Sequence, residues 1–248
     1  LISRQHSLSA ENHCNNSSAV INRHQKMAEN AEIQYDTRKV LRDMSFTIPE
    51  KTSTAIVGPS GSGKTTICSL LARFYDPQSG SITLGGHDLR EFTCDSLLSN
   101  ISMVFQNVYL FHDTVRANIL FGRPDATEDE MIAASKKARC HDFIMAIGEG
   151  GGGTLSGGEK QRISIARAIL KDALIVILDE ATASIDPENE HLIQQAISEL
   201  TKGKTIITIA HRLATIRNAD QILVVDDGRI AECGTHEELI AQGGIYKR

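Results

Sequence analysis

The sequence predicts an α/β fold in which a mainly parallel sheet carries helices on both faces. Three short apolar runs, at residues 173–178, 205–209 and 221–225, are separated by stretches with helical patterns. This alternation of strand and helix is typical of a parallel sheet. Another apolar run at 55–57 leads into a glycine-rich turn and then into a helix-forming segment. Because ligands bind at the carboxyl ends of the strands in such a sheet, the residues that follow these runs are the first site candidates.

The N-terminal part of the chain divides into two stretches of different character. Residues 1–29 are polar, rich in Ser, Asn, His and Gln, and show no sustained helical or alternating pattern. We expect them to be linker or disordered, and residues 30–248 to form one domain. Apolar residues between 31 and 48 predict short antiparallel strands that end at Pro49. These strands would form an N-terminal antiparallel β lobe.

The elements after the glycine-rich turn can also be placed from their patterns. We expect, in order, a helix at 66–75, a strand at 81–84 with a tight turn at Gly85-Gly86, a strand at 101–105, and mainly helix from 114 to 148. A helix start signal stands at 125–128. The sequence therefore predicts an inserted α-helical subdomain at about 107–168.

The glycine-rich turn matches the phosphate-loop motif G-x-x-x-x-G-K-S/T from Gly58 to Thr65. Its glycines let the backbone curl so that N–H groups point at phosphate oxygens, and the next helix presents its positive end. The candidate nucleotide-binding residues are Gly58, Pro59, Ser60, Gly61, Ser62, Gly63, Lys64, Thr65 and Thr66. Lys64 would neutralise the β- and γ-phosphates, and the Thr65 hydroxyl would hold Mg²⁺. A merely flexible turn would not need the Lys-Thr pair directly behind it.

The apolar run at 173–178 ends in two carboxylates, Asp179 and Glu180. Asp179 is suited to be a Mg²⁺ ligand together with Thr65. Glu180 can polarise a water in line with the γ-phosphate and act as general base. The alternative is that the pair only caps the following helix.

The stretch Ser156-Gly157-Gly158 opens a helix expected at 159–170. A helix N-terminus reached through such a turn is a second anion site in the same chain. One bound ATP already has its phosphates held by the first loop, so the second site makes sense if it serves a partner's nucleotide.

Six segments now occur in the order and at roughly the intervals seen in the ATP-binding domain of ABC transporters, which the chain resembles from residue 33 to the C-terminus. They are the phosphate loop, Gln106, 155–158, 177–180, 184–186 and 209–212. The resemblance implies that Tyr35, which strand position alone leaves open, stacks on adenine. It also implies that Gln106 senses Mg²⁺ and the γ-phosphate. Ser156 and Gly158 would contact the γ-phosphate bound to the opposite subunit of a head-to-tail dimer.

Two further roles follow from the resemblance: Asp186 would lie at the dimer seam, and His211 would touch the γ-phosphate. Segments 76–80 and 111–119 look most like the exporter type. This implies ATP-driven export, with a transmembrane domain that is missing from this chain, and a place on the cytoplasmic face of the cell membrane. The partner would be a second ATP-binding domain, in a homodimer or a heterodimer. The net charge of −5 argues against a nucleic-acid partner.

The sequence departs from the family in two places. The segment before Ser156 is shortened and holds four successive glycines at 150–153, from which we expect weakened coupling to a membrane domain or partner. Ala31 and the glycine-free turn at 50–52 suggest a less stable N-terminal lobe. Two other functions stay open: a soluble ABC-type ATPase, and a nucleotide-operated clamp that closes without hydrolysis. The transported substrate cannot be read from this domain.

Overall fold

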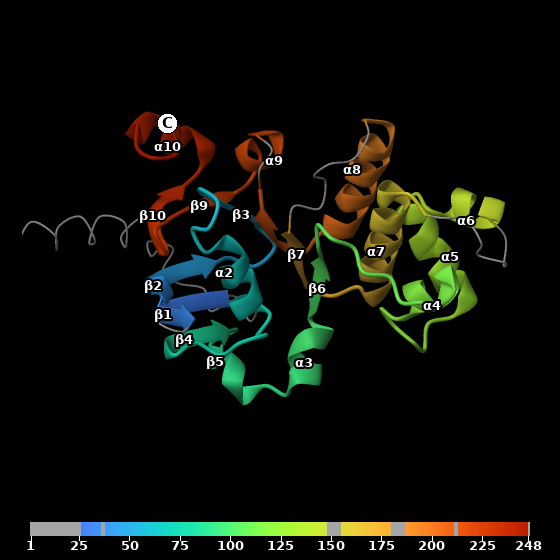
Figure 1. Cartoon of the computed structure of the whole chain (residues 1–248), viewed down its shortest axis with the longest axis horizontal. Helices are drawn as coiled ribbons and strands as arrows, with labels where there is room; N and C mark the ends of the chain where they lie inside the picture. Colours follow the sequence, from blue (N-terminus) through green and yellow to red (C-terminus); the bar gives the residue numbers. More distant parts are fainter. Residues whose placement is uncertain (1–25, 36–37, 148–154, 180–186, 211–212, 248) are drawn as a thin grey trace, which may run out of the picture. The chain divides into compact units, whose positions relative to one another are not determined.

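The computed structural model describes residues 26–35, 38–147, 155–179, 187–210 and 213–247 (Figure 1). The backbone forms two compact units, which are described separately. Unit 1 comprises Leu1–Leu98 and Thr205–Arg248, and unit 2 comprises Ser99–Lys204. Expectations for residues 1–25, for the glycine segment, and for Glu180, Asp186 and His211 fall outside the described residues.

The N-terminal lobe of unit 1 is an antiparallel sheet, as predicted. Its strands β1 (Lys26–Tyr35), β2 (Arg38–Ile48), β4 (Ser79–Leu84) and β5 (His87–Asp88) lie in the order β2-β1-β4-β5. Strand β1 begins at Lys26, inside the stretch that the sequence assigned to a linker. The β4–β5 hairpin closes through Gly85 and Gly86, which both have positive φ. Such values are what a two-residue hairpin turn needs.

The second sheet segment of unit 1 carries the phosphate loop. Strand β3 (Ser53–Val57) pairs in parallel with β8 (Thr205–Ile209) on one side and β9 (Gln221–Asp226) on the other. Strand β10 (Arg229–Gly234) is antiparallel to β9. Residues 54–57 and 222–225 are continuously buried, as expected for strands covered on both faces.

Two helices complete unit 1 near the C-terminus. They are α9 (Leu213–Arg217) and α10 (His236–Gln242). Thr235 caps α10 in a capping box with Glu238. Leu239 of α10 is fully buried in a cluster with Ile222 and Val224 of β9, so the C-terminal helix is anchored to the sheet.

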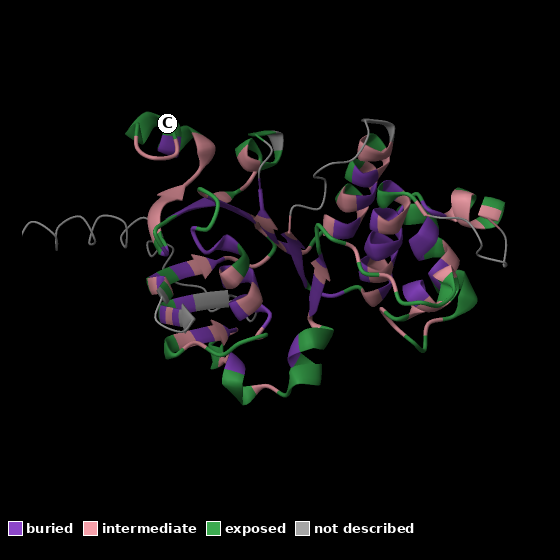
Figure 2. Cartoon of the chain, viewed as in Figure 1, coloured by how far each residue is buried: buried purple, intermediate pink, exposed green. Residues whose placement is uncertain are grey.

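Unit 2 is mainly helical around one parallel strand pair. The pair is β6 (Ile101–Val104) and β7 (Ile175–Asp179), and the helices are α4 (Val115–Leu120), α5 (Glu128–Lys137), α6 (His141–Ile147), α7 (Gly157–Lys171) and α8 (Pro187–Thr201). Thr127 and Glu130 form a capping box at the start of α5, which confirms the predicted start signal. Helix α7 packs against α4, α5 and α8, and much of it is buried (Figure 2).

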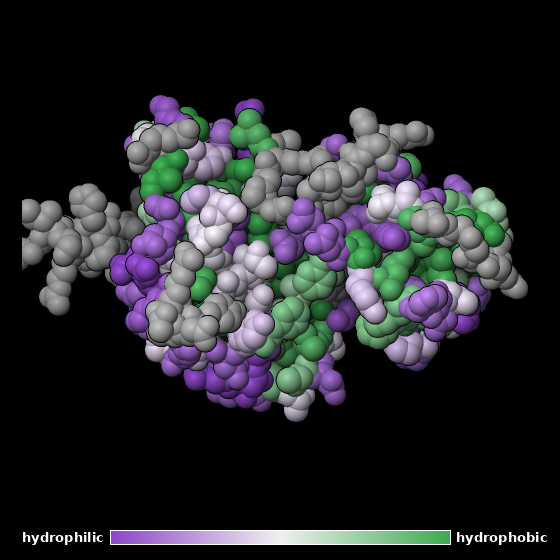
Figure 3. Space-filling view, viewed as in Figure 1, coloured by the Kyte–Doolittle hydropathy of each residue, from purple (hydrophilic) through white to green (hydrophobic). Residues whose placement is uncertain are grey.

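Several aromatic side chains of unit 2 remain on its surface. Tyr109 is 72% exposed, Phe121 60% and Phe111 39%. The space-filling view shows apolar surface among the helices of this unit (Figure 3). Within the described residues, none of the helices has the length and apolar character needed to cross a bilayer.

Candidate nucleotide site

The phosphate loop connects β3 to α2 (Lys64–Leu71) through backbone conformations that favour glycine. Gly58, Gly61 and Gly63 have φ of 149°, 78° and 108°. A Cβ on Gly58 would lie 2.1 Å from the carbonyl oxygen of Val225, and a Cβ on Gly63 would lie 2.6 Å from Leu41 Cδ2. A Cβ on Gly61 would meet nothing within 4 Å. The loop therefore lies tightly on β9 and β2 at its two ends, while its middle is open.

Lys64 holds this loop closed from the inside. Lys64 is only 7% exposed, and its Nζ donates hydrogen bonds to the carbonyl oxygens of Gly58 and Pro59, both at 2.9 Å. The backbone N–H of Ser62 also donates to the Pro59 carbonyl, at 3.2 Å. The ammonium is thus fixed within the turn, where a phosphate group would need a positive charge.

Two features show that the loop fits a phosphate ligand. The Ser62 hydroxyl oxygen is buried and has no hydrogen-bond partner among the described residues, and a buried polar atom of this kind calls for a partner. Gly63, directly before helix α2, has a left-handed conformation, and no side chain from the described part of the chain caps the helix. Its first N–H groups are therefore suited to phosphate oxygens. Thr65 is exposed and Thr66 half-buried in this same first turn.

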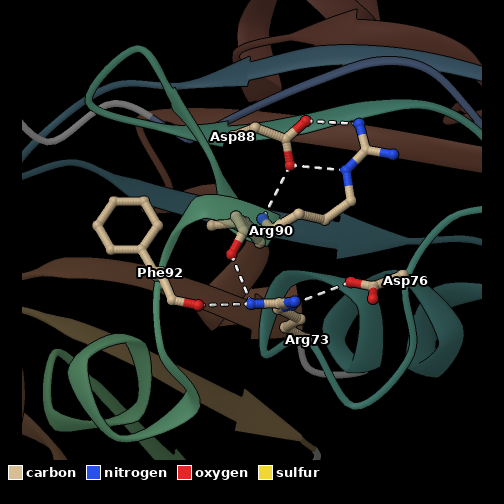
Figure 4. A network of polar contacts seen from close by, with 6 residues as sticks. Arg73, Asp76, Asp88, Arg90 and Phe92 are labelled. Atoms are coloured by element: carbon tan, nitrogen blue, oxygen red, sulfur yellow. Dashed lines mark hydrogen bonds and ion pairs between the residues drawn. The ribbon is translucent and has the colours of Figure 1, made fainter.

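The far end of α2 is fixed by Arg73 (Figure 4). The helix was predicted to run from 66 to 75, but it ends at Leu71 because Arg73 adopts a left-handed φ of 56°. Arg73 donates to the carbonyls of Leu89 and Phe92 at 2.8 Å and to Asp76 at 3.0 Å. These bonds attach α2 to the short helix η1 (Leu89–Glu91) and to the segment before α3 (Cys94–Ser99). The phosphate-loop helix is thus anchored at both ends.

Unit 2 places two other predicted residues at one sheet edge. Val104 of β6 pairs with Leu178 of β7 in parallel register. Asp179, the last residue of β7, and Gln106, which follows β6, therefore lie at the same ends of neighbouring strands. Gln106 is exposed and Asp179 is half-buried. Glu180 comes next in the chain but lies outside the described residues, as does His211. Tyr35 is the last residue of β1, and its side chain is likewise outside the description.

The Ser-Gly-Gly turn begins α7, as the sequence predicted. Ser156 Oγ accepts the N–H of Glu159 at 3.3 Å, and Glu159 Oε2 accepts the N–H of Ser156 at 2.8 Å. Ser156 and Gly157 are exposed, whereas Gly158 is buried. A Cβ on Gly158 would lie 2.7 Å from Asn189 Cβ. The helix end is therefore presented to solvent, and the second glycine is needed for packing against α8.

Sequence reasoning did not find the polar residues buried behind this turn. Gln161 and Arg162 are 2% and 5% exposed. Gln161 Nε2 donates to the carbonyl of Phe105, the neighbour of Gln106, at 3.4 Å. Arg162 donates to Asn189 Oδ1. The only signal in the sequence was that polar residues fall within an otherwise buried helical face.

Comparison with known proteins agrees with this geometry. A family model described as ABC transporter matches residues 41–183. The mycobactin import ATP-binding/permease protein IrtA of Mycobacterium tuberculosis is 49% identical over 215 residues, covering 84% of this chain and 25% of that protein. The ABC transporter aclQ of Aspergillus oryzae is 51% identical over 222 residues, covering 86% of this chain and 28% of that protein.

Two further similarities come from a bacterial relative and a solved structure. The ATP-dependent lipid A-core flippase of Francisella tularensis is 48% identical over 222 residues, covering 86% of this chain and 36% of that protein. A solved bacterial Atm1-family ABC exporter with ATP bound has a TM-score of 0.84 and 41% identity, covering 94% of this chain and 42% of that one. The chain spans between 25% and 36% of the length of these three curated relatives. It belongs to the ABC transporter family, as an ATP-binding domain of the exporter type.

Proposed function

We propose that the chain binds MgATP in the loop at 58–66 and hydrolyses it in a head-to-tail dimer with a second ATP-binding domain. The observation that carries this proposal is the presence of two separate anion-directed helix starts. One is the phosphate loop with buried Lys64 and with the Ser62 hydroxyl, which has no partner in the described part of the chain. The other is the exposed Ser156 turn. A single ATP needs only one of them, so the second serves a nucleotide bound by the partner.

Within this proposal each candidate residue has a defined task. Lys64 and the N–H groups of the loop bind the β- and γ-phosphates, and Tyr35 stacks on the adenine. Thr65, Gln106 and Asp179 would hold Mg²⁺, which would supply positive charge to the phosphate groups during hydrolysis. Glu180 accepts a proton from the attacking water, and His211 donates a hydrogen bond to the γ-phosphate.

The opposite subunit completes the site. Ser156, Gly157 and Gly158 place the N-terminus of α7 against the γ-phosphate of the partner's ATP. Because ATP then binds the closed dimer more tightly than the open chain, binding favours closure and hydrolysis reverses it. Both half-sites are present in this sequence, so either a homodimer or a heterodimer satisfies the scheme.

A transmembrane partner is supported by the exposed aromatic cluster of Tyr109, Phe111 and Phe121. The rings of Phe111 and Phe121 are 4.5 Å apart, and the Arg167 guanidinium lies 5.5 and 5.6 Å from their centres. Arg167 Nε also donates to the Asn118 carbonyl at 2.8 Å, so the cluster is held rigidly although it is exposed. Exposed apolar clusters mark interaction sites. We propose that a transmembrane domain docks here, with the chain on the cytoplasmic face of the membrane, and that hydrolysis drives transport.

The dimer is tested by measuring phosphate release per chain as a function of chain concentration, with saturating MgATP. The proposal predicts that the rate per chain rises with concentration and then saturates, because two chains form each site. Lys64→Met should abolish the activity, whereas Lys136→Met, at an exposed position on α5, should leave it unchanged. A rate per chain that is independent of concentration would rule out the shared site. ATP binding without phosphate release would favour the non-hydrolysing clamp.

A further inference from the structure

A buried arginine lies directly behind the Ser156 turn. Arg162 is one helical turn after Gly158 and is 5% exposed. Its Nη1 donates to Asn189 Oδ1 of α8, and the centre of its guanidinium lies 5.1 Å from the centre of the Phe143 ring of α6. A single side chain of α7 thus contacts two other helices of unit 2.

Asn189 is held from two sides. It accepts the hydrogen bond from Arg162, and it also occupies the space that a side chain at position 158 would need, since a Cβ there would lie 2.7 Å from Asn189 Cβ and from its Cγ. Gly158 is the second residue of α7 and Asn189 the third residue of α8. The first turns of the two helices are therefore locked together at this contact.

Burying a guanidinium is costly unless its charge is compensated and its donors are satisfied. An apolar residue of similar volume would stabilise the helix packing at least as well, so stability alone does not explain an arginine here. An apolar residue, however, cannot fix the orientation of the N-terminal turn of α7, because its contacts are not directional. A hydrogen bond to Asn189 combined with stacking on Phe143 defines the rotation and the position of the N-terminal turn of α7.

We propose that Arg162 is a positioning residue for the turn at 156–158, acting through Asn189 and Phe143. The proposal rests on the proposed function, in which this turn contacts the partner's γ-phosphate. The contacts of Arg162 with α8 and α6 support the turn from behind, in addition to the capping bonds between Ser156 and Glu159. These contacts set how well the turn fits the nucleotide of the partner, and hence how tightly the ATP-bound dimer forms.

Arginine is suited to this task and lysine is not. The planar guanidinium can donate in its plane to Asn189 while its face lies on the Phe143 ring. A lysine ammonium retains the charge and the aliphatic stem but has no plane to orient. Arg162→Lys therefore separates positioning from simple charge and packing.

The test measures two quantities in a Glu180→Gln background, where ATP is not consumed. One is the affinity of the dilute chain for a fluorescent ATP analogue, which reports the phosphate loop of unit 1. The other is the dissociation constant of the ATP-bound dimer, from analytical ultracentrifugation. We expect Arg162→Lys and Asn189→Ala each to weaken the dimer by about tenfold, and the double variant to be no worse than either single one. The affinity for the ATP analogue should change less than twofold.

Two further variants serve as controls. Asn189→Asp offers Arg162 a carboxylate acceptor, so it should retain the dimer affinity of the parent. Arg116→Lys changes an exposed arginine of α4 whose guanidinium bonds to Glu128, far in sequence from the turn at 156–158, and it should have no effect on either quantity. Melting temperatures of all variants show whether any loss of dimerisation merely follows a loss of folding.

The outcomes distinguish the proposed function from the positioning role of Arg162. If Glu180→Gln alone fails to dimerise with ATP, the proposed function is wrong and the role of Arg162 falls with it. If Glu180→Gln dimerises and Arg162→Lys in that background dimerises equally well, the proposed function stands and the positioning role is refuted. A loss of dimer affinity that is matched by equal losses of ATP affinity and melting temperature would also refute it, because that pattern marks a purely structural residue.

Discussion

The three glycines of the phosphate loop make different demands on the fold, and substituting them by alanine tests the loop geometry. Gly58→Ala places a Cβ 2.1 Å from the Val225 carbonyl oxygen, which is part of buried strand β9. Since real Cβ atoms stay about 3 Å or more from such an atom, β9 or the loop must shift by about 1 Å. Overpacking of this kind costs about 1–3 kcal/mol. The unfavourable φ adds about 1–2 kcal/mol.

Gly61→Ala measures the free-energy cost of the backbone conformation alone, because the new Cβ would meet nothing within 4 Å while φ at this position is 78°. The left-handed conformation costs about 1–2 kcal/mol for a residue with a side chain. Alanine also lowers the conformational entropy of the unfolded chain, which stabilises the folded state by about 0.4–1 kcal/mol. We therefore expect a net loss of about 1 kcal/mol for Gly61→Ala, against about 2–4 kcal/mol for Gly58→Ala.

The assay is reversible urea unfolding of the full chain, supported by melting temperatures. At about 2–4 °C per kcal/mol for a chain of this size, Gly58→Ala should lower the melting temperature by about 5–15 °C and Gly61→Ala by a few degrees. Gly203→Ala is the matched control, since Gly203 has a φ of 68°, an equally open Cβ position and no part in the loop. It should behave like Gly61→Ala. Equal losses for Gly58→Ala and Gly61→Ala would refute the close approach of the loop to β9.

Three other perturbations are expected to change stability in defined directions. Lys51→Gly should raise the free energy of unfolding by about 0.5–1 kcal/mol, because Lys51 has a φ of 58° that glycine adopts without strain. The hydrogen bond from its backbone N–H to Thr205 Oγ1 is kept in the variant. A lower free energy of unfolding in urea would contradict this prediction. Ala31→Val should add about 1 kcal/mol in the same assay, since Ala31 is 1% exposed and lines a small apolar cavity. A loss of stability would show that this cavity cannot take the two methyl groups. Burial raises the pKa of the Cys140 thiol to about 12 from its usual 9.0. Because the folded pKa is raised, the thiol's contribution to stability is complete below about pH 9 and is lost as the pH rises towards 12. The stability difference between the wild type and Cys140→Ala should therefore shrink by about 2 kcal/mol from pH 8 to pH 10.5, and a constant difference would show that the thiol is not desolvated.

Local signals in the sequence were sufficient for most strands and helix starts. The strand at 205–209 is observed with the same bounds, and the Gly85-Gly86 hairpin and the start of α5 are observed where expected. Each depends on residues that are close in sequence: an apolar run, a pair of glycines, a capping box. The phosphate loop could be predicted for the same reason, since its glycines and Lys64 lie close together in the sequence.

Features that depend on distant residues could not be predicted. Helix α2 ends early because Arg73 takes a left-handed conformation and donates hydrogen bonds to the carbonyls of Leu89 and Phe92. The sequence has no glycine at this position that would have predicted the helix end. The burial of Arg162 depends on Asn189, which lies in another helix. The burial of the Ser62 hydroxyl, without a partner among the residues that the structure describes, also depends on how the loop folds. Glu180 and His211 remain predictions, because they lie outside the described residues.

The central claim, hydrolysis of ATP at a site shared by two chains, is tested most directly by comparing the wild type with Glu180→Gln. Phosphate release and the ATP-dependent change in molecular mass are measured on the same samples. The account predicts that the wild type releases phosphate and dimerises only transiently, whereas Glu180→Gln releases almost none and accumulates as an ATP-bound dimer. If ATP binds and the Glu180→Gln chain stays monomeric, or if it hydrolyses ATP as fast as the wild type, the shared site with Glu180 as general base is wrong.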